Sequence, residues 1–314
     1  MCKFPFGFFQ LVPSNKNTFM KEISPPSQEK ETKKGSNMDL NEIKVCVLRI
    51  EGTNCEEESY YAFKRLGATT EIVHLNEFLR RNKRLSDYHI LMLPGGFSGG
   101  DYIRAGVIFA ARLKSTLGKD LERFIEEGKP VLGICNGFQI LVEAGILPGF
   151  GGIMTEEPEA ALTTNDSDRF ECRPTWLKKE KTTKCIFTRD IKDKQVLMIP
   201  SAHAEGKFVL PKNKEKALLE SLKANGQVVF RYVTPEGKEN PGYPYNPNGS
   251  IYDIAGICNK EGNVFGMMPH PERVFFRFTH NDWTRDEEKE KVTEKEGDGR
   301  VIFKSALRYV AEHF

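Results

Sequence analysis

The strongest signal of the fold is the stretch KPVLGICNGFQ, residues 129–139. A short apolar run at 130–134 leads directly to Cys135, which stands between Gly133 and Gly137. This order is typical of a nucleophile elbow, a sharp turn between a strand and a helix, with cysteine in place of serine. The glycines permit the tight turn, and the positive end of the following helix favours a thiolate. The stretch therefore predicts a cysteine nucleophile at the end of a strand, and an ordinary buried cysteine is the alternative.

Strand and helix patterns alternate on both sides of this elbow. Strands are predicted at 43–50, 69–74, 89–93 and 130–134, and helices at 54–67, 103–117, 120–127 and 136–144. Asn54 is expected to cap the first of these helices, because a turn rich in glutamate follows it. Alternation of this kind predicts an α/β fold, a mostly parallel open sheet with helices on both faces. Ligands of such sheets bind outside the carboxyl ends of the strands, where the elbow and the glycine-rich segment 94–100 both fall.

From residue 151 onward the pattern changes to short β-rich runs. Strands are predicted at 170–177, 195–199, 207–210, 228–233, 254–258 and 264–268, with helices at 214–224 and 301–314. We interpret these strands as an extension of the sheet together with a small antiparallel β part. No long linker separates the two halves, so residues 43–314 are predicted to form a single domain. Residues 279–300 are a strongly charged insertion, expected to be an exposed loop or a frayed helix.

The N-terminal region differs from the rest of the chain. Residues 14–36 are polar and rich in lysine, so residues 1–42 are expected to form a disordered extension. Residues 1–10 are rich in phenylalanine but lack the continuous apolar core and the cleavage site of a secretory signal. An alternative is that the working chain starts at Met20 or Met38.

The composition argues against several classes of protein. The 314 residues carry a net charge of +2 with 29% charged residues of both signs, which fits neither a nucleic-acid binder nor a protein of the membrane surface. No apolar run approaches the roughly 18 residues that a membrane helix needs. The 7 cysteines are scattered without a C-x-x-C pair, so neither a disulfide framework nor a zinc site is expected. This cysteine usage favours a reducing, cytoplasmic location.

A general base for Cys135 is available in the segment GMMPHPER. His270 and Glu272 stand two residues apart after a predicted strand, and Pro269 and Pro271 fix the backbone around them. Residues two apart in an extended segment point the same way, so Glu272 can orient the imidazole ring. A nucleophile, a base and an orienting carboxylate are the parts of a catalytic triad. Taken alone, His-Pro-Glu would also fit a surface turn.

A catalytic site of this kind also needs an oxyanion hole. Gly95 and Gly96 follow the strand at 89–93, and glycine lets backbone amides approach a ligand closely. The loop lacks the G-K-[ST] ending of a nucleotide-binding P-loop and the spacing of a dinucleotide fingerprint, and a plain turn is the alternative. Elsewhere, His203 and Glu205 could bind a metal, but no third ligand suggests itself and no metal site is predicted.

Several motifs together resemble the class I (triad) glutamine amidotransferases. The elbow GICNGFQ, the loop PGG and the segment PHPE carry this general resemblance. Longer stretches are similar, more narrowly, to the glutaminase subunits of phosphoribosylformylglycinamidine synthase. They are GGFSGGDYIRAG from Gly95, RFECR from Arg169, AHAEGKF from Ala202, NPNGS from Asn246, IAGICN from Ile254 and GNVFGMMPHPER from Gly262. The resemblance covers nearly the whole patterned chain and implies a flavodoxin-like core.

The resemblance implies a role for each site residue. Cys135 attacks the side-chain amide of glutamine, His270 acts as general base and then as acid, and Glu272 orients His270. The amides of Gly96 and Asn136 hold the oxyanion. The products are glutamate and ammonia.

The resemblance also implies that Gln139 helps to seat the glutamine substrate.

The resemblance implies partner subunits as well. The ammonia passes to a larger synthase subunit. That subunit uses ATP and magnesium to convert formylglycinamide ribonucleotide to the amidine, a step of de novo purine biosynthesis. A small bridging subunit is a further implied partner, and this chain itself is expected to bind no cofactor.

The sequence departs from the family pattern at a few positions, namely Gly99, Ala105, Ala204 and Lys207. We interpret the segment around His203, Glu205 and Lys207 as a surface that faces the partner. Three alternatives stay open: a triad amidotransferase serving a different acceptor synthase, a peptidase-like or chaperone-like relative, and a regulatory subunit without catalysis. The CNGFQ and RFECR motifs argue against the first, and the filled triad positions argue against the last.

Overall fold

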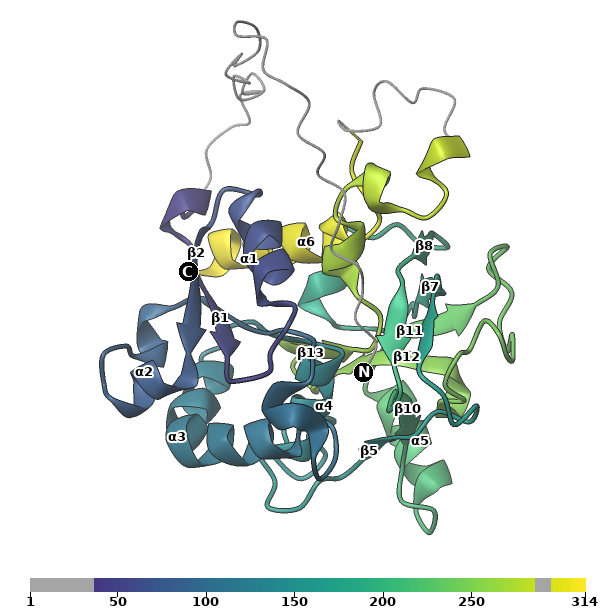
Figure 1. Cartoon of the computed structure of the whole chain (residues 1–314), viewed down its shortest axis with the longest axis horizontal. Helices are drawn as coiled ribbons and strands as arrows, with labels where there is room; N and C mark the ends of the chain where they lie inside the picture. The colour runs from purple at the N-terminus through teal and green to yellow at the C-terminus, as the bar shows by residue number, and fades with distance from the viewer. Residues whose placement is uncertain (1–36, 286–294) are drawn as a thin grey trace, which may run out of the picture. The chain divides into compact units, whose positions relative to one another are not determined.

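The structure, a computed structural model, describes residues 37–285 and 295–314 (Figure 1). Asn37–Phe314 form one compact unit. Most of the expected N-terminal extension, residues 1–36, and the middle of the charged insertion, residues 286–294, lie outside the described residues.

Nine strands form the main sheet, and five of them make a parallel core. The strand order is β2-β1-β3-β4-β13-β12-β11-β7-β8. The parallel strands are β1 (Lys44–Arg49), β2 (Thr69–His74), β3 (Ile90–Leu93), β4 (Val131–Ile134) and β13 (Val264–Met267). With β13 as the fifth parallel strand, this is the 2-1-3-4-5 order of flavodoxin-like sheets. The predicted fold class is confirmed.

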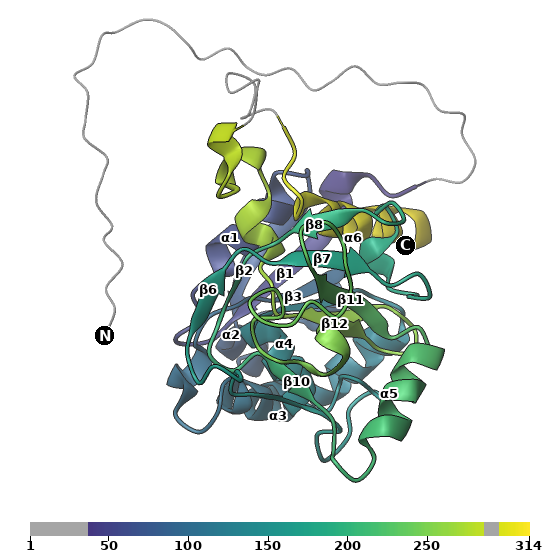
Figure 2. The same cartoon turned by 90° about the vertical axis from the view of Figure 1, so that its right-hand side faces the viewer.

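The antiparallel part continues the same sheet beyond β13. Its strands are β12 (Ile254–Cys258), β11 (Val228–Val233), β7 (Trp176–Lys179) and β8 (Val196–Met198). Two further pairs are antiparallel, β5 (Ala161–Thr163) with β10 (Lys207–Val209) and β6 (Glu171–Arg173) with β9 (Ser201–His203). Figure 2 shows these strands in front of the parallel ones.

One strand prediction in this region is wrong. The single strand expected at 170–177 is two strands, β6 and β7, which belong to different sheets. Pro174 lies between them, and because proline has no N–H to donate, it interrupts the ladder. The short strands β5 and β9 were not predicted, because three residues are too few to show a period of two.

The helices cover both faces of the parallel core (Figure 1). Helices α1 (Glu56–Lys64) and α6 (Arg300–His313) contact each other on one face. On the other face lie α2 (Leu75–Leu79), α3 (Val107–Glu126) and α4 (Asn136–Glu143), while α5 (Glu215–Ala224) follows β10. In the described part of the chain, no helix is both long and apolar enough to cross a membrane.

Two of the predicted helices are one. The structure has the single helix α3 where helices were expected at 103–117 and 120–127. The buried residues Leu113, Leu117 and Leu121 keep helical spacing across Gly118. A continuous apolar stripe packed on the sheet outweighs the cost of one glycine in a helix, about 1 kcal/mol.

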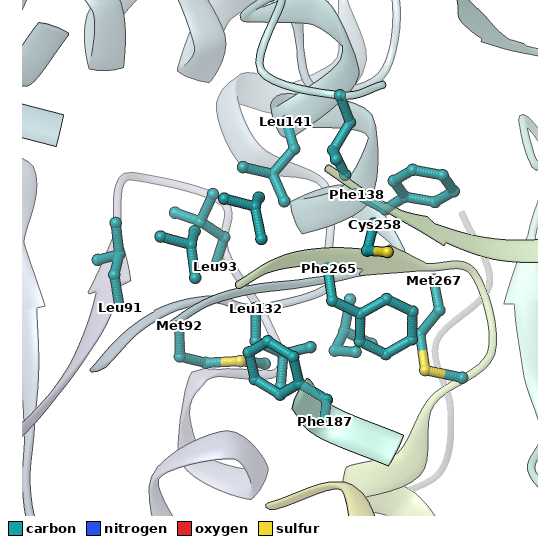
Figure 3. Close-up of a cluster of buried hydrophobic side chains, with 14 of the residues drawn as sticks. Leu91, Met92, Leu93, Leu132, Phe138, Leu141, Phe187, Cys258, Phe265 and Met267 are labelled. Atoms are coloured by element: carbon teal, nitrogen blue, oxygen red, sulfur yellow. The ribbon is translucent and has the colours of Figure 1, made fainter. Parts of the chain in front are cut away.

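The core is built on the apolar strands at the centre of the sheet. Met92 of β3, Leu132 of β4 and Phe265 of β13 are fully buried. Figure 3 shows Phe138 of α4 on one side of these strands and Phe187 on the other. Strands covered on both faces are apolar along their whole length, which is why the sequence marks them as continuous runs. Each such side chain contributes about 1.5–3 kcal/mol on burial.

Two predicted boundaries need correction. Ordered structure begins before residue 43, because the 3-10 helix η1 (Leu40–Glu42) precedes β1 and the Met38 N–H donates to the Ala311 carbonyl (3.1 Å). The charged insertion also differs from the simple exposed loop that was expected, in its described residues 279–285 and 295–300. His280 is buried, and its Nε2 accepts a hydrogen bond from the Asp298 N–H (3.2 Å), so the two ends are tied together.

Candidate active site

The turn at Cys135 has the geometry of a nucleophile elbow. Cys135 ends β4 and precedes α4 with φ 53° and ψ −107°, a backbone conformation that is strained for a residue with a side chain. A Cβ atom on Gly133 would lie 2.6 Å from the Gly137 carbonyl oxygen, and one on Gly137 would clash with the Leu93 carbonyl oxygen. Both glycines are therefore required for the close packing of β3, β4 and α4. Cys135 is buried, and its Sγ lies 3.6 Å from the Ala202 carbonyl oxygen.

The predicted base lies where the chain leaves β13. His270 precedes the 3-10 helix η6 (Pro271–Val274), which contains Glu272. Glu272 Oε1 lies 2.5 Å from His270 Nδ1, and the two side chains are almost fully buried. The pair forms in a 3-10 turn, not in the extended segment that the sequence predicted. The contact still forms, because His270 precedes the turn with non-helical backbone angles (φ −103°, ψ 89°) and Glu272 is in its first residues.

Burial and charge act in opposite directions on His270. Burial works to lower the pKa of His270, but the negative charge of Glu272 and the interactions with the Cys135 and Cys55 sulfurs raise the pKa, and the net result lies well above the ordinary value. Its Nε2 atom is buried and has no hydrogen-bond partner in the described part of the chain. This nitrogen is therefore free to exchange a proton with a sulfur or a substrate atom. A charged imidazole near the sulfur favours the thiolate form that a cysteine nucleophile needs.

The triad residues meet at Gly95. A Cβ atom added to Gly95 would lie 2.7 Å from His270 Cε1 and 3.3 Å from Cys135 Cβ. The loop after β3, the elbow after β4 and the turn after β13 thus converge at one edge of the parallel sheet. The three side chains that the sequence selected from distant segments are brought together by this convergence.

The predicted oxyanion residues lie on both sides of this meeting point. Gly96 has φ +135°, and Asn136 is the first residue of α4. The Asn136 side chain ties the two segments together, because its Oδ1 accepts from the Ser98 N–H (3.2 Å) and its Nδ2 donates to Gln139 Oε1 (3.0 Å). Backbone amides at a helix start and in a glycine loop are suitable donors to a developing oxyanion.

Gln139 is part of the wall of the site. Its Nε2 donates to the Glu205 carbonyl oxygen (2.6 Å), and its Oε1 accepts from Asn136. The Glu205 carboxylate in turn accepts from the Ala105 N–H (3.2 Å). The predicted role of Gln139 in seating glutamine stays a prediction, and in this structure its carboxamide connects α4 with the segment after β9.

The proposed partner-facing segment is only partly at the surface. His203 is buried, with Nδ1 3.2 Å from Asn165 Oδ1, so it cannot contact a partner directly and that prediction is wrong for His203. Burial, followed by the positive charge of His270, lowers the pKa of His203 to about 3. Glu205 and Lys207 are half-buried, and Lys207 pairs with Asp166.

Sequence reasoning missed a second thiol beside the base. Cys55 is buried at the start of α1, and Arg273 Nη2 donates to its Sγ (3.2 Å). Donor atoms of Cys55, His270 and Glu272 lie within 4.8 Å of one another, a spacing that could accommodate a metal ion. The close His270–Glu272 pair uses one nitrogen and one oxygen of this group, so a triad explains it without a metal. No local pattern marks Cys55, because its neighbours come from a segment more than two hundred residues away.

Comparison with known proteins identifies the family. A model of the CobB/CobQ-like glutamine amidotransferase domain matches residues 42–310. The subunit PurQ of phosphoribosylformylglycinamidine synthase from Archaeoglobus fulgidus is 54% identical over 283 residues, which cover 87% of this chain and 99% of that protein. The chain belongs to the PurQ family of glutamine amidotransferases.

Other relatives agree with this assignment to the PurQ family. PurQ of Picrophilus torridus is 44% identical over 265 residues, which cover 84% of this chain and 98% of that protein. Among solved structures, "Structure of PurLQS from Thermotoga maritima" matches with a TM-score of 0.63 and 32% identity, covering 86% of this chain and 99% of that one. The matches span the elbow, the glycine loop and the His270 turn, so the site lies inside the region shared with the PurQ family.

Proposed function

We propose that this chain is the glutaminase subunit of a phosphoribosylformylglycinamidine synthase, in which Cys135, His270 and Glu272 release ammonia from glutamine. The proposal rests on one observation, the convergence of an elbow cysteine, a buried histidine–glutamate pair and a glycine loop in a chain of the PurQ family.

The geometry supports a two-step acyl transfer. The Cys135 thiolate adds to the side-chain carbonyl carbon of glutamine, and the oxygen takes up negative charge near the Gly96 and Asn136 amides. His270 gives its proton to the leaving nitrogen, so that the C–N bond breaks and ammonia departs. Water then attacks the thioester while His270 accepts its proton, which releases glutamate and restores the thiolate. Glu272 keeps the imidazole oriented throughout.

The acceptor side of the reaction belongs to partner subunits. The Archaeoglobus relative is named as a subunit of a synthase, and the solved Thermotoga structure is that of an assembly, PurLQS. We extend this to the present chain: a larger synthase subunit uses ATP and magnesium to convert formylglycinamide ribonucleotide to the amidine, and a small subunit bridges the complex. This chain binds no cofactor in the proposal, the complex is cytoplasmic, and Glu205 and Lys207 stay candidates for the contact with a partner.

The test is glutamate release by the full chain, alone and with the synthase subunits, ATP and formylglycinamide ribonucleotide. Cys135→Ala is the matched control, since it removes only the sulfur. Strong stimulation by the complete mixture, absent in Cys135→Ala, is the expected result. Turnover that requires Cys135 but ignores the mixture would point to a different acceptor synthase. Turnover that persists in Cys135→Ala would overturn the mechanism.

A further inference from the structure

Asn54 does not have the role that its sequence context predicts. The N-terminal cap of α1 is Cys55, and no side chain caps this helix. Asn54 lies one residue earlier, in the turn that follows β1, and its carboxamide points to the loop after β3. Asparagine is a preferred capping residue, so its side chain is expected to make another contact when it does not cap the helix.

That contact is a clamp on both sides of Gly96. The Asn54 Oδ1 accepts a hydrogen bond from the Phe97 N–H (3.1 Å). The Asn54 N–H donates to the Gly95 carbonyl oxygen (3.4 Å), which also accepts from the Cys55 N–H (3.1 Å). The residue before Gly96 and the residue after it are therefore both held by Asn54.

The packing at Gly96 shows how closely Asn54 approaches this peptide. A Cβ atom on Gly96 would lie 2.6 Å from Asn54 N and 2.8 Å from Asn54 Oδ1, and φ is +135°. Only glycine fits against the asparagine at this point.

The direction of the Gly96 amide follows from the same bonds. In a trans peptide the C=O and the following N–H point in opposite directions. Because the Gly95 carbonyl is directed at the start of α1, the Gly96 N–H is directed away from α1. In the described part of the chain this N–H has no hydrogen-bond partner. Gly95 itself borders Cys135 and His270, so the free amide belongs to the catalytic edge.

We propose that Asn54 is a positioning residue of the glutaminase reaction, which holds the Gly96 amide ready for the oxyanion. The inference rests on the proposed function and adds a residue to it. An oxyanion donor is effective only when it is already oriented before charge develops, because reorienting a peptide during the reaction would cost part of the stabilisation. Asn54 supplies this orientation without touching the substrate.

The expected effect is partial, since Asn54 is not alone. The Phe97 N–H is shared with the Gly52 carbonyl oxygen (3.1 Å), and Thr53 pairs with Gly96 in an isolated bridge. Complete removal of an oxyanion donor costs about 100- to 1,000-fold in kcat. Loss of the Asn54 side chain leaves the donor present but less restrained, so kcat is expected to fall about tenfold, a modest share of that range.

The experiment uses the full chain with the synthase mixture and compares Asn54→Ala and Asn54→Ser with the wild type. Both side chains are too short to reach Phe97, and the serine variant serves if the alanine variant does not fold. Asn82→Ala is the matched control, an exposed asparagine in the turn after α2 whose side chain donates to Glu77 Oε2 (2.8 Å). Four quantities are measured: kcat, KM for glutamine, the rate of Cys135 alkylation by iodoacetamide, and the affinity for a γ-aldehyde analogue of glutamine.

The two chemical probes separate the oxyanion from the thiol. The aldehyde forms a carbon–sulfur bond with Cys135 while its carbonyl electron pair becomes an oxyanion, so its binding needs the Gly96 amide. Alkylation displaces iodide from iodoacetamide and creates no oxyanion. Both Asn54 variants should therefore lose kcat and aldehyde affinity by about the same tenfold factor, with KM and alkylation rate within about twofold of wild type.

Three outcomes would overturn the inference. One is an unchanged kcat in both variants. Another is an alkylation rate that falls as far as kcat, which would mean a general distortion of the site. The third is a rise in KM at constant kcat, which would make Asn54 a substrate-binding residue. A wild-type chain whose glutamate release does not depend on Cys135 would instead refute the proposed function, so the two failures are distinguishable.

Discussion

The parallel half of the molecule and its antiparallel half contribute to the site in different ways. The antiparallel half consists of β12, β11, β7 and β8 of the main sheet together with the separate pairs β5–β10 and β6–β9. The loops that end β3, β4 and β13 carry Gly96, Cys135 and His270, two of them in backbone conformations with positive φ. The antiparallel half contributes enclosure: the Ala202 carbonyl beside the sulfur and the Glu205 carbonyl that holds Gln139. The edge of the parallel sheet therefore sets the chemistry, because its strand ends converge, while the antiparallel half forms the wall around it.

The largest effect should come from the parallel half, at the elbow. Gly137→Ala would place a Cβ atom against the Leu93 carbonyl oxygen, so β3 and α4 can no longer pack and glutamate release should be undetectable. The control is Gly118→Ala in α3, where a Cβ atom would meet only Met154 Sδ at 3.9 Å. That control should keep full activity and gain about 0.5–1 kcal/mol of stability. If the activity of Gly137→Ala stayed within tenfold of wild type, the strand ends of the parallel half would not determine the chemistry as described.

The next effect concerns the orienting carboxylate. Glu272→Gln keeps the shape of the side chain but removes the charge that holds the His270 ring, so kcat should fall by about 1,000- to 10,000-fold. KM for glutamine should change little, because Glu272 is buried behind the histidine. Steady-state kinetics of glutamate release measure both constants. A loss below about tenfold would mean that Glu272 does not orient the base.

A change in the antiparallel half should act on substrate binding more than on the chemical step. Glu205→Ala removes the carboxylate that accepts from the Ala105 N–H, which should loosen the wall around Gln139. We expect KM for glutamine to rise about three- to tenfold with kcat nearly unchanged, since one hydrogen bond to a charged group contributes about 1.5–3 kcal/mol at most. Measuring assembly with the synthase subunit in the same variant tests the partner contact. Normal assembly would mean that Glu205 supports the glutamine site and does not contact the partner subunit.

The pH dependence of stability should reveal the His270–Glu272 pair directly. The raised pKa of His270 means that the folded chain holds this proton more tightly than the unfolded chain does. The resulting stabilisation is fully present below about pH 6.5, the ordinary pKa of histidine, and is lost as pH rises through the folded pKa. Glu272→Gln should therefore lower the melting temperature more at pH 6 than at pH 9. Each unit by which the pKa of His270 falls corresponds to about 1.4 kcal/mol.

The opposite pH trend, or equal loss of stability at both values, would mean that the carboxylate does not raise the pKa of His270. Thermal melts followed by circular dichroism at each pH give the comparison.

The smallest effect should come from the rim of the antiparallel half. Lys207→Ala removes an ion pair with Asp166, whose side chain is largely exposed to solvent. Such pairs contribute about 0–1 kcal/mol, so the melting temperature and the basal glutaminase activity should hardly move. Reduced affinity for the synthase subunit, measured by calorimetry, would mark Lys207 as a partner contact. A loss of basal activity would place it, unexpectedly, in the wall of the site.

The parallel half was far easier to predict than the antiparallel half. Strands such as 89–93 and 130–134 are buried on both faces, so their apolar runs stand out in the sequence. The strands β5 and β9 are three residues long and stabilised by partners distant in the chain, so nothing local marks them. The same reason explains His203, which is buried and whose ring contacts Asn165 of the loop after β5, a segment distant in the sequence.

Local sequence was enough to identify the reactive groups: the cysteine between two glycines, the histidine–glutamate pair and the glycine loop. These signals are local, because the tight turns and the strand ends need particular residue types at adjacent positions. The residues that support the reactive groups can be recognised only in the folded structure. Asn54 reads as a helix cap and Cys55 as a scattered thiol, yet the convergence of α1 with the loops after β3 and β13 places the first beside Gly96 and the second beside His270. Such contacts arise from packing between distant segments, and no local pattern of side chains encodes them.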